Sequence, residues 1–472
     1  MSQPRWLRLP RLRRSLALAS LVLSVSALYL LRAEAARPSL SLGTTVSGGL
    51  VTLAGRGVHG TLRMSQTQLA AGSGGTFYAE LDLEADRGAG EVERAPLSLA
   101  IVLDTSGSMS GAKLEEARRS VRKLLEGMRD DDEVAFVRYA DHAEVIQPLA
   151  RVRDVRAELV ARLSQLEATG GTNIPSGLAE GERQLARAGF SRVKRVVLVS
   201  DGLDSSRARA EDLARDTFAR GVTVSSLGVG LDFDESYMAS LAELGHGNFG
   251  FVKDAGSLAR FLDRELVEAA TTMVEGTKVR VELPRGVSFL RAVGGVARVV
   301  DGAVEVDVGS ISAGDARRVV LELASSLELG QRASLSGEVS WRTVRGGPVS
   351  VGFAGLEVAS TDDLAAVERS RDLGTLASAT SAFASVRQLE AASAYARGDV
   401  ARAGALLDTS ERELARAIEA APAAAAPLVR QVESLRDAKR DFGRAPPKSP
   451  EGNAAAKAVF ERDSANMRKN TF

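Results

Sequence analysis

Between residues 97 and 268 the sequence alternates short apolar runs with amphipathic stretches, and this alternation constrains the fold most strongly. Runs such as VVLVS at residues 196–200 are almost entirely apolar, as strands of a buried parallel sheet are. From Leu114 to Met128 apolar residues recur every three or four positions, which predicts a helix. Such alternation favours an α/β fold, a doubly wound and mostly parallel sheet with helices on both faces. The expected strands are residues 97–103, 133–139, 193–200, 222–229 and 248–252.

The segments on either side of this unit show the two-residue alternation of half-buried strands. Residues 76–83, TFYAELDL, alternate well, and short alternating runs return after Glu275. Their spacing predicts a β-sandwich at residues 269–360. The strands of the β segment at 37–96 are too few to form a stable domain alone. We therefore expect them to pair with the later strands, so that the α/β unit is an insertion in a sandwich.

The C-terminal part differs in composition from the rest. Residues 361–443 are rich in Ala, Arg, Leu and Glu at helical spacing and predict a short helical region. Within it, residues 392–407 resemble the junction of a tetratricopeptide-type helix pair. Only one copy is visible, whereas such arrays need about three, so we expect a simple helical hairpin. Residues 444–472 carry several prolines and many charges, which predicts a disordered tail.

The first 36 residues have the pattern of an export signal. Five arginines precede an uncharged run at residues 16–31, and Ala33-Glu34-Ala35 follows as a cleavage-site-like motif. A signal peptide is expected, with an uncleaved N-terminal membrane anchor as the alternative. Either implies an exported protein that is periplasmic, envelope-associated or extracellular. The chain has no cysteine, which excludes a cysteine-linked lipid anchor, and its 61 basic and 61 acidic residues give no overall basis for binding nucleic acid.

Oxygen-bearing side chains gather where two of the predicted strands end. The first strand runs into DTSGS, and a second acid directly follows VVLVS. A threonine lies in the loop TGGTNIPSG between two predicted helices. Sites in doubly wound sheets form at the carboxyl ends of the strands, so these groups are expected to converge into a ligand set for a hard cation such as Mg²⁺, with Mn²⁺ or Ca²⁺ as alternatives. The candidate metal ligands are Asp104, Ser106, Ser108, Thr172 and Asp201.

This pattern resembles the metal-ion-dependent adhesion site of von Willebrand factor type A (VWA) domains, which has the form D-x-S-x-S with a distant Thr and a distant Asp. All five positions match, and the likeness extends over roughly residues 97–265. The flanking segments are loosely similar to bacterial secreted or membrane-tethered members. The resemblance implies a Rossmann-like VWA domain at residues 97–268. It also implies that hydroxyls bind the metal directly, that the aspartates often act through water, and that an Asp or Glu of another protein completes the coordination.

The function that follows is a divalent-cation-dependent protein–protein interaction module at the cell envelope, serving adhesion or assembly. Two alternatives stay open: a structural scaffold whose metal only stabilises the fold, and a Mg²⁺-dependent hydrolase. DTSGS resembles the start of aspartate-nucleophile phosphatases, but Ser106 stands where those enzymes usually have a second aspartate. No G-x-S-x-G, P-loop or H-E-x-x-H motif occurs either, so we do not expect an enzyme.

Three further features receive ordinary structural interpretations. GHGNFG at residues 245–250 has the letters of a dinucleotide fingerprint, but it follows a predicted helix and precedes a strand, which is the reverse of the required order. Asp204, three residues after Asp201, is expected to be a solvated loop residue, with an acid that supports the metal ligands from behind as the alternative. His142 and His246 have no second histidine at ligand spacing and are expected in surface loops or turns.

Overall fold

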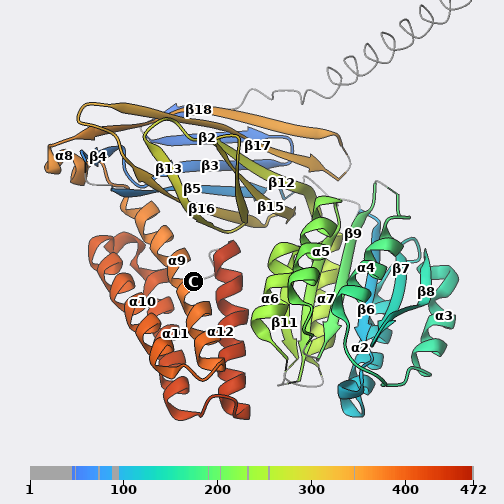
Figure 1. The fold of residues 1–472 in the computed structure, drawn as a ribbon. Coiled ribbons are helices and arrows are strands. Elements are labelled where there is room, and N and C mark those ends of the chain that lie inside the picture. The colour runs from blue at the N-terminus through green and yellow to red at the C-terminus, as the bar shows by residue number, and fades with distance from the viewer. Residues whose placement is uncertain are drawn as a thin grey trace, which may run out of the picture. The chain divides into compact units, whose positions relative to one another are not determined.

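Three six-stranded sheets are present in the part of the chain that the structure describes, one in the α/β unit and two in the sandwich (Figure 1). The predicted signal peptide or anchor at residues 1–36 lies outside this part. Among the described residues, no helix combines the length and the apolar character needed to cross a membrane. The structure is a computed structural model, and it describes residues 45–47, 49–72, 75–87, 95–189, 191–201, 204–230, 233–252, 256–344 and 346–469.

The sheet of the α/β unit has the order β11-β10-β9-β6-β7-β8. The five strands expected from the alternation are present and pair in parallel, and β8 adds an antiparallel edge that the sequence analysis did not expect. The central strand β6 is buried along its whole length, which explains its continuous apolar run. The strands are β6 (Leu97–Asp104), β7 (Glu133–Tyr139), β8 (Ala143–Arg151), β9 (Val193–Ser200), β10 (Thr223–Val229) and β11 (His246–Val252).

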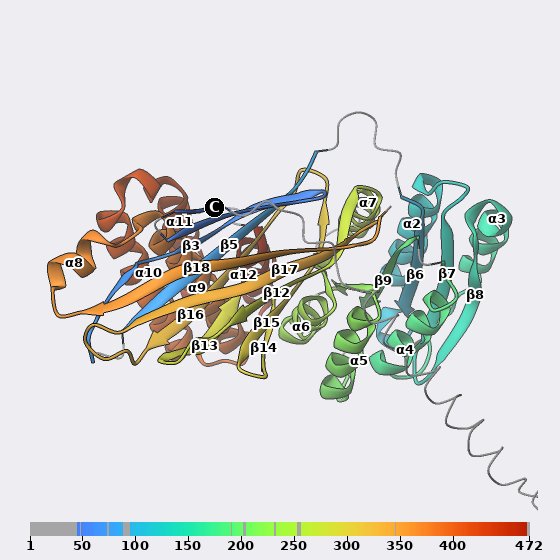
Figure 2. The same ribbon diagram turned by 90° about the horizontal axis from the view of Figure 1, so that it is seen from above.

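Helices cover both faces of this sheet. Figure 2 shows α2 and α7 on one face and α4 and α5 on the other. Alternate residues of β6 enter the two resulting cores, because successive side chains of a strand point to opposite faces: Ile101 packs with α2 and α7, and Val102 packs with α4. The doubly wound fold is therefore confirmed. The helical elements are η1 (Gly107–Met109), α2 (Ala112–Gly127), α3 (Val152–Leu163), α4 (Ile174–Leu185), α5 (Arg207–Ala219), α6 (Glu235–Leu244) and α7 (Ser257–Ala270).

The sandwich contains strands from both sides of the α/β unit, so the expected insertion is confirmed. Its sheets have the orders β1-β2-β3-β5-β16-β13 and β14-β15-β12-β17-β18-β4. The early strand β5 pairs with the late strand β16, and β4 pairs with β18. The early strands are β1 (Thr45–Ser47), β2 (Leu50–Gly55), β3 (Val58–Met64), β4 (Gln68–Ala70) and β5 (Thr76–Ala85). The late strands are β12 (Thr272–Glu282), β13 (Val287–Val293), β14 (Val296–Val300), β15 (Ala303–Ser312), β16 (Ala316–Ser325), β17 (Arg332–Thr343) and β18 (Pro348–Thr361).

A helical region follows the sandwich, as predicted. Helices α9 and α10 form a hairpin whose turn includes Gly398, with a φ of 92°, and Asp399, whose side chain accepts a hydrogen bond from Arg402 N at 3.0 Å. This hairpin contains the stretch that resembles a tetratricopeptide junction. The elements are α8 (Leu364–Arg369), α9 (Leu373–Ala396), α10 (Val400–Ala420), η2 (Pro422–Ala424), α11 (Ala425–Arg444) and α12 (Pro450–Lys469).

The expectation of a disordered tail at residues 444–472 is wrong for α12, which packs against α9, α11 and the α/β unit. Its buried face combines apolar residues, among them Val459 and Phe460, with polar ones: Lys457, Asp463 and Asn466 are each fully buried. Ser385 of α9 donates to Asp463 at 2.8 Å and accepts from Asn466 at 2.9 Å, and Glu235 of α6 pairs with Lys457. Since distant partners satisfy these side chains, a segment of low hydrophobicity is packed rather than solvated.

Candidate metal centre

The candidate site lies at the carboxyl ends of two neighbouring strands, β6 and β9. These strands are parallel and in register, with Leu103 opposite Val199. Asp104 is the last residue of β6, and Asp201 directly follows the last residue of β9. The register therefore brings two acids that are far apart in sequence to adjacent points on the edge of the sheet, where sites form in open α/β folds.

Asp104 is fully buried and has hydrogen bonds to both carboxylate oxygens. Oδ1 accepts from the backbone N–H of Ser106 at 2.8 Å, and Oδ2 accepts from the hydroxyl of Ser200 at 2.8 Å. Burial raises the pKa of Asp104, the hydrogen bonds from Ser106 and Ser200 oppose this rise, and the neighbouring Asp201 adds to it. A divalent cation would stabilise the ionised form, because it supplies the opposite charge that this buried carboxylate needs.

The two serines of the DTSGS loop connect the acids. Their hydroxyl oxygens, Ser106 Oγ and Ser108 Oγ, are 2.9 Å apart, and Ser108 Oγ donates to Asp201 Oδ1 at 2.7 Å. Four of the five predicted ligands thus belong to one hydrogen-bonded network that runs from Asp104 to Asp201. The network gathers oxygen atoms from two strand ends into a single cluster.

Thr172, the fifth predicted ligand, is half-buried in a loop that is bonded to the DTSGS loop. Gly107 N donates to Gly170 O at 3.0 Å, and Thr169 N donates to Thr105 O at 2.8 Å. Among the hydrogen bonds between described residues, none joins the Thr172 hydroxyl to the other four ligands. The Thr172 loop is thus held next to the DTSGS loop by backbone hydrogen bonds, one of them at Gly170, two residues before Thr172.

Asp141, in the turn between β7 and β8, holds this loop from the other side and was not singled out from the sequence. Its Oδ1 accepts from Gly171 N at 3.0 Å, and its backbone oxygen accepts from the Asn173 side chain at 3.1 Å. A Cβ on Gly170 would lie 2.4 Å from Asp141 Oδ2, and Gly170 also has a φ of 77°. The two glycines of TGGT are explained by this close carboxylate, since side chains there would collide with it.

Asp204 is bonded to two helix starts, so the expectation of a solvated loop aspartate is wrong. Its Oδ2 accepts from Ile174 N at 2.8 Å, at the start of α4, and its Oδ1 accepts from Ser206 N at 2.7 Å, just before α5. This carboxylate therefore joins the loop of Thr172 to the loop of Asp201. The spacing of Asp204 before a helix was the available signal, because aspartates there commonly bind backbone N–H groups.

Lys113, near the start of α2, is a second residue, after Asp141, that sequence reasoning missed. Its ammonium pairs with Asp201 Oδ2, the carboxylate oxygen that Ser108 does not use. The Lys113 side chain is 31% exposed, whereas that of Asp201 is 0% exposed. The site thus contains one positive side chain next to its two acids.

The donor set fits a hard divalent cation. All five predicted ligands offer oxygen, which suits Mg²⁺, Ca²⁺ or Mn²⁺ better than a soft metal. Within the described residues, no three His, Cys, Asp or Glu side chains are grouped so that they could hold a metal. Any ion bound at this edge of the sheet would therefore depend on the hydroxyls as well as on Asp104 and Asp201.

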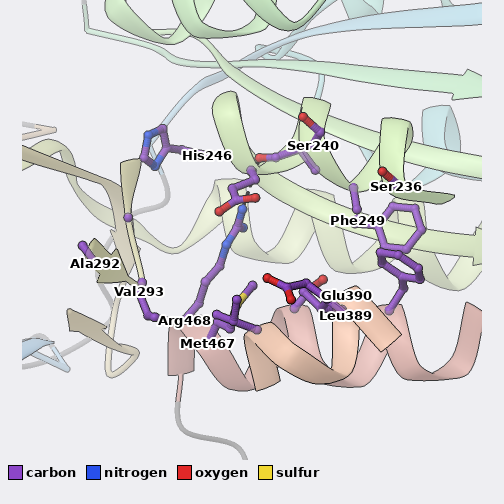
Figure 3. Close-up of a pocket in the computed structure, with 18 of the residues that line it drawn as sticks. Ser236, Ser240, His246, Phe249, Ala292, Val293, Leu389, Glu390, Met467 and Arg468 are labelled. Carbon is purple, nitrogen blue, oxygen red and sulfur yellow. Dashed lines mark hydrogen bonds between the residues drawn. The ribbon is translucent and has the colours of Figure 1, made fainter. Parts of the chain in front are cut away.

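A cavity of about 400 Å³ lies away from these residues, between α6, β11, β13, α9 and α12 (Figure 3). His246, expected in a surface loop or turn, lines it at the start of β11, and its ring centroid is 3.9 Å from that of Phe218. Burial lowers the pKa of His246 to about 3. Arg468 of α12 also lines the cavity and donates to the backbone oxygens of Gly247 and Ala242. Its cation is thus engaged by the protein itself.

Comparisons with known proteins agree with this geometry. Residues 98–264 match the family model of the von Willebrand factor type A domain. The chain is 30% identical over 260 residues to "Uncharacterized protein YfbK" of Escherichia coli (strain K12), a match that covers 52% of this chain and 44% of that protein. The chain thus spans less than half the length of this relative.

Two solved structures have a similar fold. A von Willebrand factor type A protein from Catenulispora acidiphila matches with a TM-score of 0.66 and 20% identity, over 91% of this chain and 99% of that chain. The ArnB paralog VWA2 from Sulfolobus acidocaldarius matches with a TM-score of 0.57 and 14% identity, over 87% and 98%. The family match shows that the chain contains a von Willebrand factor type A domain at residues 98–264, and the two solved structures share its fold.

Proposed function

We propose that this chain is a divalent-cation-dependent protein–protein interaction module, serving adhesion or assembly at the cell envelope. The observation that carries the proposal is the hydrogen-bonded path from Asp104 through Ser106 and Ser108 to Asp201. VWA domains commonly mediate protein–protein interactions or adhesion, and they are generally not enzymes. We assign no catalytic residue. The four networked residues and Thr172 would hold Mg²⁺, or alternatively Mn²⁺ or Ca²⁺.

The ion, when bound, supplies an electrophilic centre that accepts a carboxylate from a partner protein. The contacts of the two acids favour a contribution through water. Both oxygens of Asp104 already accept hydrogen bonds, and those of Asp201 accept from Ser108 and Lys113. The Ser108 hydroxyl donates its proton to Asp201, so lone pairs of its neutral oxygen could still bind a cation directly. Hydroxyl ligands add no negative charge, so an Asp or Glu side chain of the partner would meet a site that still attracts anions.

The envelope location is supported by the export pattern of residues 1–36, read either as a signal peptide or as an N-terminal anchor. An exported protein meets divalent cations and surface proteins outside the cytoplasm. The proposed location and the proposed mode of binding are therefore compatible.

The test is a pull-down of native partners from the source cell envelope, in excess Mg²⁺ and again in EDTA. Asp104→Ala and Thr172→Ala are compared with wild type and with Asp212→Ala, which removes an aspartate that is 72% exposed on α5. We expect the same partner to be recovered by wild type and Asp212→Ala in Mg²⁺. We expect its loss in EDTA and in both site variants, each of which should keep its circular dichroism spectrum.

Partner recovery that is identical with and without EDTA, and in all variants, would contradict the proposal. If Mg²⁺ then raised the melting temperature of wild type but not of Asp104→Ala, the ion would have the role of stabilising a scaffold. Asp104→Asn serves as a second variant, because it keeps the volume of the buried side chain if the alanine variant is poorly folded.

A further inference from the structure

Lys113 stands out at the candidate metal centre because it brings a positive charge to a site that is built for a cation. It is the second residue of α2, and its ammonium reaches Asp201 across the opening of the DTSGS loop. The backbone of Gly230, beyond β10, lies against the end of the side chain: a Cβ there would be 3.0 Å from Lys113 Cε and 3.2 Å from Nζ. Asp201 therefore pairs with the ammonium, and the backbone at Gly230 lies beside it.

The Lys113 ammonium and the Ser108 hydroxyl bind different oxygens of the Asp201 carboxylate. Ser108 donates to Oδ1 at 2.7 Å, and Lys113 pairs with Oδ2. Ser108 is itself a predicted ligand, so the lysine is one carboxylate away from the place where the ion would bind. Asp141 and Asp204 are further acids near the site, and both accept hydrogen bonds from backbone N–H groups of neighbouring loops.

The charge of the site depends on this lysine. A divalent ion between Asp104 and Asp201 leaves that group of charges neutral, and Lys113 makes it positive. A nearby ammonium repels the ion and attracts an incoming carboxylate, and both effects are strong where water is partly excluded. The same residue therefore acts with opposite signs on the two binding steps.

Resting on the proposed function, we infer that Lys113 is a specificity-determining residue that weakens binding of the divalent ion and strengthens binding of an anionic partner group to the ion-loaded site. Ion binding alone is then kept moderate, while the loaded site selects carboxylates over neutral ligands. The inference concerns the charge of the side chain, so an arginine should preserve it.

The experiment compares Lys113→Gln and Lys113→Arg with wild type in the full chain. Lys123→Gln is the matched control, because Lys123 lies on the same helix, is 60% exposed, and pairs with Asp263 away from the site. Mg²⁺ affinity is measured by calorimetric titration. Carboxylate affinity is measured with acetate, through its effect on water proton relaxation by bound Mn²⁺.

We expect Lys113→Gln to bind Mg²⁺ about 10-fold more tightly and acetate about 10-fold more weakly than wild type. Lys113→Arg and Lys123→Gln should remain near wild type in both measurements. Lys113→Gln values equal to those of Lys123→Gln, or a change of both affinities in the same direction, would overturn the inference.

Failure of this inference and failure of the proposed function are distinguishable. A folded wild-type chain that binds neither Mg²⁺ nor Mn²⁺ overturns both. If wild type binds Mg²⁺ and Asp104→Ala does not, but Lys113→Gln is unchanged, the metal centre stands and only the role of Lys113 is overturned.

Discussion

Two lysine–carboxylate pairs lie at the same edge of the VWA sheet, and their surroundings differ. Lys113 pairs with Asp201 beside the candidate metal ligands, and its side chain is 31% exposed. Lys457 of α12 pairs with Glu235 at the start of α6, and its side chain is 0% exposed. The Lys457 ammonium also lies 3.9 Å from the centroid of the Phe233 ring. Solvent thus reaches the ammonium of the first pair but not that of the second, although the carboxylates are 0% exposed in Asp201 and 11% exposed in Glu235.

We infer that solvent access to the ammonium, rather than the chemistry of the pair, distinguishes a binding site from a structural contact. A buried ion pair under an aromatic ring is difficult to rearrange, since each charge would be left without water. An ammonium that solvent reaches can turn away at lower cost, because water replaces its contact. Lys457–Glu235 therefore holds α12 to the VWA domain, and Lys113–Asp201 is suited to rearrangement when a cation binds.

The largest effect is expected from breaking the buried pair. Lys457→Met should lower the free energy of unfolding by about 3–5 kcal/mol, because Glu235 remains buried without its partner. Urea unfolding measures the loss, and amide hydrogen exchange should increase in α12 (Pro450–Lys469). Adding Mg²⁺ should not reduce the difference from wild type, since the pair is separate from the candidate ligands.

The matched control is the double variant Lys457→Met/Glu235→Gln, which leaves no buried charge and should regain part of the loss. If Lys457→Met were as stable as wild type, or if Mg²⁺ restored it, the distinction between the two pairs would fail.

A third buried group tests whether burial outweighs a nearby opposite charge. Glu80 of β5 lies near Arg318 of β16, which donates to Asn466 O of α12 at 2.7 Å. Burial, with a further contribution from Asp82, raises the pKa of Glu80 to about 8. The folded state thus binds a proton that the unfolded chain releases at lower pH. The stability contribution of Glu80 is fully present below about pH 4.5 and is lost as pH rises towards 8.

Glu80→Gln removes this titration, so the variant should be more stable than wild type by up to about 4 kcal/mol at pH 8 and close to it in stability at pH 4.5. Melting temperatures measured between pH 4.5 and 8.5 check the sign. A wild type whose advantage over the variant grew with pH would show that Arg318 keeps Glu80 ionised in spite of its burial.

The parts of the fold that the sequence predicts are those held together by apolar burial. The alternation of apolar strands with helices predicts the VWA sheet, and the shortage of early strands predicts that they pair with later ones, as β5 does with β16. Both arguments rest on apolar burial. Helix α12 escapes such reasoning. Its buried Lys457, Asp463 and Asn466 find partners up to 222 residues away, and no local pattern reveals them.

The candidate site shows the same limit. Ser106 and Ser108 are recognisable because they follow Asp104 at fixed spacing. Their hydroxyls lie in one hydrogen-bonded network with Asp201, as expected for side chains that converge. Asp141 is not recognisable in this way, and the spacing of Asp204 indicates only a residue near a helix start, since both also bind backbone N–H groups of loops elsewhere in the sequence. Spacing along the chain identifies candidate ligands, whereas the residues that position them depend on tertiary packing.

A smaller loss of stability is expected from a change in the Thr172 loop, which lies next to the candidate metal ligands. Gly170→Ala should lower the free energy of unfolding by about 2 kcal/mol, because Gly170 has a φ of 77° and its new Cβ would collide with Asp141 Oδ2. Gly221→Ala is the control, with a φ of 82° and no atom within 4 Å of the new Cβ, and should cost about 1 kcal/mol. Calorimetry should also show weaker Mg²⁺ binding for Gly170→Ala alone. If Gly170→Ala and wild type bound Mg²⁺ with equal affinity, the conformation of the Thr172 loop would not affect the metal centre.

The smallest effect on stability is expected at the exposed pair, and there the direction of the Mg²⁺ response is informative. In EDTA, Lys113→Gln should be about 1 kcal/mol less stable than wild type, because Asp201 keeps Ser108 but loses its ammonium partner. Mg²⁺ replaces the lost positive charge, and each 10-fold gain in its affinity adds about 1.4 kcal/mol at saturation. The variant should therefore reach or exceed wild type in saturating Mg²⁺, measured by urea unfolding of both proteins. If Mg²⁺ left the difference unchanged, as is expected for Lys457→Met, Lys113–Asp201 would be a structural contact like the buried pair.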